Sequence, residues 1–125
     1  MRDQKLLSIR PELNLTSASE ELSIESFQNE VLRPILNFQN NLTLQLLLQS
    51  KHYEDKDMKG DSARFLKYLK KYVNSNKVFR IQLLGIVIGM LTESEFQFYS
   101  DNQKEFNKRI IQMQINRFID QLGKS

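Results

Sequence analysis

The sequence predicts an all-α protein, a compact bundle of about five helices. Apolar residues recur at helical intervals over most of the chain, and strand-like alternation is confined to Leu42, Leu44 and Leu46. Capping residues precede the candidate helices, and the loops between them are short. The chain has two prolines, four glycines and no Asn-Gly turn in 125 residues. It therefore lacks the turn residues expected of a β protein.

The composition is that of one globular domain, with 40% hydrophobic and 26% charged residues. Cysteine is absent, which excludes disulfides and thiolate chemistry. No secretory signal is recognisable near the N-terminus, and we expect a cytoplasmic protein. Residues 1–17 lack a helical apolar period, and Pro11 disfavours helix just before it. We therefore expect an extended N-terminal arm over 1–17 and a single helical domain over 18–125.

A long helix is predicted from Ser17 or Ser23 to about Ser50, because both serines can cap a helix start. Pro34 lies inside it and should produce a kink. Around Leu44–Leu48 the helix becomes apolar on every side, which places it in the domain centre or in a subunit interface. Its first part has one apolar stripe, formed by Ile24, Phe27, Val31, Ile35, Phe38, Leu42 and Leu46.

Four further helices are predicted over residues 62–74, 77–90, 93–99 and 101–122. Ser75 or Asn76 can cap the second of these, and Thr92 and Glu95 have capping-box spacing at the start of the third. The second contains "LLGIVIGML", which is too short to span a membrane. In a soluble helix its glycines favour close backbone approach, and we expect another helix to cross near Gly85 and Gly89. The last helix has two displaced apolar stripes, which a small monomer does not easily cover. This predicts a homodimer.

The polar face of the long helix supplies the main candidate binding residues. An amide-rich face with a guanidinium group could bind a carboxylate or a phosphate. The same residues could instead form a solvated face or a buried network that reaches other helices. The candidate ligand residues are Asn29, Glu30, Arg33, Asn37, Arg80 and Arg109.

A basic face on the 62–74 helix is the candidate nucleic-acid surface. No nucleic-acid-binding motif accompanies it, and we expect nucleic-acid binding to be the weakest alternative. Its residues are Arg64, Lys67, Lys70 and Lys71.

The sequence contains no recognisable catalytic machinery. Its one histidine, His52, lies beside acidic residues at a spacing that matches no zinc or calcium motif. No nucleophile elbow, Walker A or dinucleotide-binding motif is present. We therefore predict no metal site, no cofactor and no catalytic residue.

Four segments of the chain resemble a family of short, all-helical Bacteroidetes proteins, some labelled glyoxalase. The resemblance covers most of the chain and is weakest over residues 50–75. The residues do not support the label, because glyoxalase I resembles paired βαβββ modules that hold a metal through His and Glu. The segments are "SIRPE", "FQNEVLRPILNFQN", "GIVIGMLTESEFQFY" and "NKRIIQMQINR".

These observations predict a self-associating interaction module. The first alternative is an anionic-ligand binder or enzyme that uses Glu30, Arg33 and Asn37, and the second is a weak nucleic-acid binder.

Overall fold

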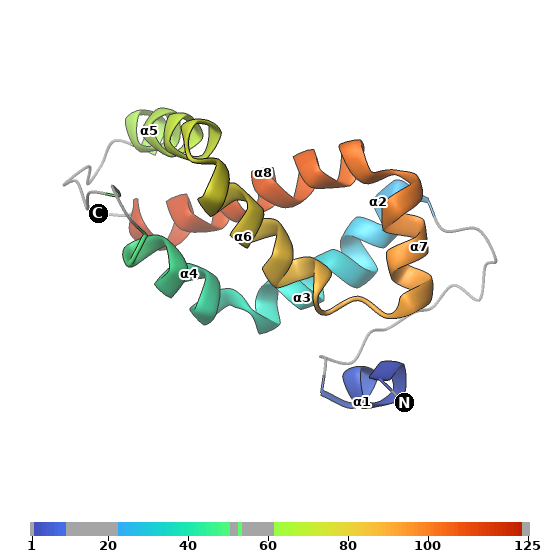
Figure 1. The fold of residues 1–125 in the computed structure, drawn as a ribbon. Helices are drawn as coiled ribbons and strands as arrows, with labels where there is room; N and C mark the ends of the chain where they lie inside the picture. The colour runs from blue at the N-terminus through green and yellow to red at the C-terminus, as the bar shows by residue number, and fades with distance from the viewer. Residues whose placement is uncertain (1, 10–22, 51–52, 54–61, 124–125) are drawn as a thin grey trace.

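The computed structural model describes residues 2–9, 23–50, 53 and 62–123, and all of its regular elements are helical. The all-α prediction is therefore confirmed for these residues, but they form more helical elements than the five predicted (Figure 1). The elements are α1 (Arg2–Ile9), α2 (Ile24–Phe27), the π-helical turn η1 (Gln28–Leu32), α3 (Arg33–Phe38), α4 (Asn40–Leu48), α5 (Ser62–Ser75), α6 (Lys77–Ile88), α7 (Glu93–Asp101) and α8 (Gln103–Leu122).

Residues 2–9 are helical, so the expectation of an extended conformation there is wrong. Helix α1 docks through Leu6, which is buried in the core. The Asp3 carboxylate accepts hydrogen bonds from the Glu93 backbone N–H at 3.1 and 3.2 Å, which places a negative charge at the N-terminus of α7. The boundary expected at residue 17 lies outside the described residues, so the division into arm and domain stays a prediction.

The predicted long helix is divided, and its kink is not the one expected. The helix begins at Ser23, which forms a capping box with Ser26. A π turn precedes Pro34, and the Arg33 N–H bonds to the Gln28 carbonyl. Wider turns of this kind occur where an α-helix is under strain, and the proline ring would crowd a carbonyl of the preceding α-helical turn. The chain then breaks again at Gln39, between α3 and α4.

These irregular turns change which side chains are buried. The stripe is buried at Phe27, Val31 and Ile35, but Leu42 is 56% exposed and Phe38 is 48% exposed. A π turn takes more residues than the 3.6 of an α-helical turn. Residues after the π turn therefore point in other directions around the helix axis than they would in a continuous α-helix. The predicted burial of Phe38 and Leu42 is wrong for this reason.

Helix α8 runs along the molecule and contributes to two hydrophobic cores (Figure 1). Its early residues, including Phe106 and Ile110, pack with α2, η1, α3 and α7. Its later residues, including Ile115 and Phe118, pack with α4, α5 and α6. The two apolar stripes predicted for this helix thus both pack against cores of the same chain, although Ile111, Ile119 and Leu122 of the second stripe are only partly buried. The second stripe no longer argues for a dimer.

The start of α7 follows the sequence prediction. Thr92 and Glu95 form a reciprocal capping box, with bonds of 3.2 Å and 2.9 Å. The start of α6 does as well, because the Asn76 side chain accepts from the Phe79 N–H at 3.1 Å.

Among the described residues, no second helix packs against the position of a Cβ atom at Gly85 or Gly89, so the predicted close crossing is wrong. Helix α1 contacts Gly89 through the Arg2 Nη2, which donates to the Gly89 carbonyl oxygen at 3.0 Å. Both glycines are exposed, and a Cβ atom added at Gly85 would meet no atom within 4 Å. Leu83, Leu84 and Val87 pack in or against the cores, whereas Gly85 lies on the exposed side of α6.

Candidate functional site

Part of the predicted polar face does converge with a second element. The Arg33 Nε donates to the Asn29 Oδ1 at 2.9 Å. From α8, the Arg117 Nη2 donates to the Asn37 Oδ1 at 2.5 Å. This end of the face thus contacts α8, whereas the side chains of Asn29, Arg33 and Asn37 remain exposed.

A polar pocket of about 500 Å³ lies at this contact. Two arginines enter it, Arg33 and Arg117, together with the carboxylate of Asp120. Asn40 and Gln121 form a reciprocal amide pair at one side, with bonds of 2.8 and 3.0 Å. The pocket can bind an anion through the guanidinium donors that remain.

The two arginines affect each other electrostatically. Partial burial lowers the pKa of the Arg117 guanidinium, and the positive charge of Arg33 lowers it further, while Asp120 opposes both effects. An arginine keeps its proton at neutral pH despite such shifts. The pocket therefore holds two cations and one carboxylate.

The remaining predicted ligand residues lie elsewhere. Glu30 does not line this pocket. Arg109 links α8 to η1, because its Nη1 donates to the Gln28 Oε1 at 2.9 Å and its Nε donates to the Glu105 carboxylate at 2.7 Å. Arg80 lines a separate hollow between α5, α6 and α8. The six candidates thus do not form one site.

The predicted nucleic-acid residues are exposed along α5. Lys70 lines the same hollow as Arg80, and Lys108 of α8 joins them there. Arg64, Lys67 and Lys71 do not line it. The structure thus brings together one residue from each predicted set.

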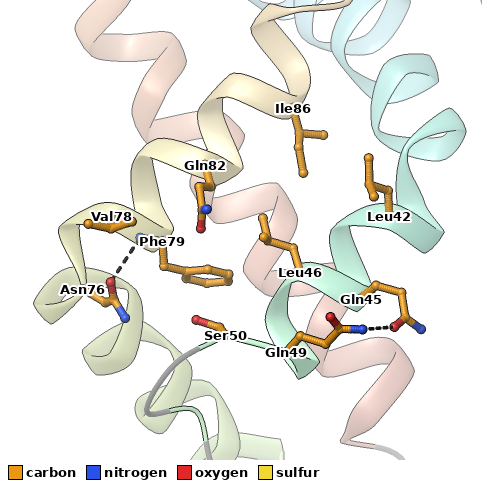
Figure 2. Close-up of a pocket in the computed structure, with 10 residues that line it drawn as sticks. All are labelled: Leu42, Gln45, Leu46, Gln49, Ser50, Asn76, Val78, Phe79, Gln82 and Ile86. Atoms are coloured by element: carbon orange, nitrogen blue, oxygen red, sulfur yellow. Dashed lines mark hydrogen bonds between the residues drawn. The ribbon is translucent and has the colours of Figure 1, made fainter.

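An apolar groove with a volume of about 800 Å³ lies between α4 and α6. Figure 2 shows Leu42 and Leu46 of α4 facing Phe79 and Ile86 of α6 across it. Val78 stands at its edge and is 67% exposed. The other lining residues are neutral and polar: Gln45, Gln49, Ser50, Asn76 and Gln82.

Sequence reasoning missed Arg117, Asp120, Gln121 and Lys108 as site residues. All four lie on α8. Arg117, Asp120 and Gln121 share their pocket with residues of α3 and α4 that are about 80 positions away in the sequence. No local spacing connects such distant segments. The groove did leave a signal, since the separation of polar and apolar faces fails after Leu42.

No described helix is long and apolar enough to cross a membrane. No group of three or more His, Asp or Glu side chains that could hold a metal ion occurs among the described residues. His52 and its acidic neighbours lie outside them.

No family model, curated protein or solved structure matches the chain.

Proposed function

We propose that the protein is a self-associating interaction module in which two copies join through the α4–α6 groove. One observation carries the proposal: the groove is open, apolar and free of charged side chains among its described lining residues (Figure 2). Apolar surfaces of this kind on soluble domains mark interaction sites.

The groove has the chemistry of a helix-binding surface. Leu42, Leu46, Phe79 and Ile86 form its apolar walls and floor, and glutamine and asparagine side chains lie around them. An amphipathic helix binds such a groove by inserting apolar side chains that are three or four residues apart.

A second copy of the chain offers a matching helix beside its own groove. Val78, Ile81 and Gly85 lie one turn apart on the outer side of α6 and form a ridge. Val78 is 67% exposed and Ile81 is 56% exposed, and no side chain covers Gly85. A two-fold axis can place the ridge of each copy in the groove of the other.

Charge favours this pairing over pairing through other faces. The chain carries a net charge of +3, so two copies repel each other on average. The groove and the ridge carry no charged group, which allows them to meet without burying like charges.

Light scattering coupled to size-exclusion chromatography and analytical ultracentrifugation test this function. The wild-type chain should form dimers whose proportion rises with concentration. Val78→Glu and Ile81→Glu should weaken dimerisation at least about tenfold, because each dimer would bury the new carboxylate twice.

Phe96→Glu is a matched control. Phe96 is also a half-exposed apolar residue, but it lies on α7 and does not line the groove. The proposal is refuted if the chain stays monomeric at every concentration up to about 0.5 mM. Any dimerisation would then have a dissociation constant weaker than that of ordinary specific association. So does a dimer that Phe96→Glu disrupts and Val78→Glu leaves intact.

A second candidate function is the binding of a small anion by the polar pocket between α3 and α8. The convergence of Arg33 and Arg117 on one pocket favours it. Both guanidinium groups already donate to asparagine side chains, so a ligand would use their other donors. Calorimetry with a small dicarboxylate tests it, and Arg117→Gln should abolish the heat of binding.

A further inference from the structure

Three basic side chains from three helices surround a hollow of about 430 Å³. Lys70 comes from α5, Arg80 from α6 and Lys108 from α8. Arg80 is partly buried and the two lysines are exposed. A planar guanidinium beside two mobile ammonium groups is suited to binding a phosphate or a carboxylate.

The positive charge of this hollow is only partly compensated, because the Glu105 carboxylate interacts with Lys108 as well as with Arg109. No carboxylate is among its described lining residues, and the sequence contains no Asp or Glu from Ser62 to Thr92. Glu105 lies one turn before Lys108, but it pairs with Arg109 at 2.7 Å. The three cations form no ion pair with any described residue. Like charges held together in this way favour an anionic ligand.

Side-chain amides add neutral hydrogen-bonding groups. Asn74 and Asn107 line the hollow. The Asn107 Oδ1 accepts a hydrogen bond from the Tyr99 hydroxyl, which leaves its amide nitrogen as a donor. The hollow thus presents donors with and without charge.

Apart from the Gln112 side chain, the remaining wall of the hollow is apolar. Leu84, Ile111 and Ile115 line it, and they belong to or border on the hydrophobic cores. The volume lies within the range of small-molecule pockets and exceeds what a bare inorganic ion occupies. A ligand that fills it therefore needs an apolar part as well as an anionic group.

We propose that this hollow binds a small phosphate monoester that carries a compact apolar or aromatic group. At neutral pH such a phosphate bears nearly two negative charges, which three cations can balance. The Arg80 guanidinium binds two phosphate oxygens, and the two lysines neutralise the remaining charge. The apolar group lies against Leu84 and Ile111. This site is independent of the α4–α6 groove and of the Arg33 pocket.

Nuclear magnetic resonance titration of the full chain with phenyl phosphate tests the proposal. The amide resonances of α5, α6 and α8 around the hollow should shift, with saturation at a Kd of about 1 mM or tighter. Inorganic phosphate should bind about fivefold more weakly, because it lacks the apolar group. Benzyl alcohol, which has no charge, should not bind.

Variants separate the site from general electrostatic attraction. Arg80→Gln and Lys108→Gln should each weaken phenyl phosphate binding about tenfold. Lys71→Gln is the matched control, because it removes the same charge from an exposed α5 residue that does not line the hollow. The affinity of Lys71→Gln for phenyl phosphate should stay within about twofold of the wild-type affinity.

Four results overturn the proposal. The first is no saturable shift with up to about 10 mM phenyl phosphate. The second is an equal loss of affinity in Lys71→Gln and Arg80→Gln, which would indicate unspecific attraction. The third is a set of shifts confined to the neighbourhood of Arg33 and Arg117. The fourth is equal affinity for inorganic phosphate and phenyl phosphate, which would remove the role of Leu84 and Ile111.

Discussion

Replacing Gly85 by alanine should stabilise the monomer. Gly85 lies in the interior of α6, where glycine reduces helix stability because it loses more backbone freedom on folding than other residues. A Cβ atom at this position would meet nothing within 4 Å, so alanine introduces no steric cost. The expected effect is therefore the full difference in helix propensity.

That difference is about 1 kcal/mol in favour of alanine. For a domain of this size it corresponds to a rise in melting temperature of about 4 °C. In urea denaturation the midpoint should rise by roughly 0.5 M, with an unchanged slope. Circular dichroism at low protein concentration measures both quantities, and repetition in the Val78→Glu background removes any contribution from self-association.

Gly123→Ala is the matched control and should have the opposite effect. A Cβ atom at Gly123 would lie 2.8 Å from the Ile119 carbonyl oxygen and 3.1 Å from Phe65 Cδ2. Such overpacking costs about 1–3 kcal/mol. If Gly85→Ala destabilised the protein as much as Gly123→Ala, α6 would be covered at Gly85 and the reasoning would be refuted.

Two further predictions concern buried polar groups. Gln114→Met should stabilise the protein by about 1 kcal/mol, because the fully buried Gln114 Oε1 has no hydrogen-bond partner among the described residues. Removing this unpaired acceptor outweighs the loss of the hydrogen bond that the Gln114 Nε2 donates to the Leu83 carbonyl. A loss of stability of more than about 1 kcal/mol in urea denaturation would contradict this prediction. Burial raises the pKa of Tyr99 above its usual 10.0. The folded state thus disfavours the tyrosinate, so the stability linked to Tyr99 is present below about pH 10 and is lost as the pH rises further. Tyr99→Phe should flatten this alkaline loss in denaturation curves, and an identical pH dependence in both proteins would argue against it.

The sequence predicted the local features of the fold well. Its apolar period indicated helices, and the capping box at Thr92 and Glu95 marked the start of α7. For the start of α6 the sequence offered Ser75 or Asn76 as the cap, and the structure shows Asn76. These signals are reliable because a cap acts through hydrogen bonds within one helical turn.

The binding hollows were predicted only in part. Arg33 and Asn37 were chosen for their spacing on one helix face, and the structure places both in a pocket. Their partner Arg117 could not be inferred, because the 2.5 Å contact joins residues that are 80 positions apart. Lys70 and Arg80 were assigned to different functions, and only the packing of α5 against α6 and α8 brings them together.

The sequence by itself determined that the chain is helical, where several helices begin, and that one stretch carries cations without acids. Tertiary structure decided which faces are covered. A π turn before Pro34 and a break at Gln39 rotate Leu42 to the surface, whereas α8 packs both of its apolar stripes against cores of the same chain. The physical reason is that capping and helix propensity act over a single turn, while burial depends on which distant element packs against each face.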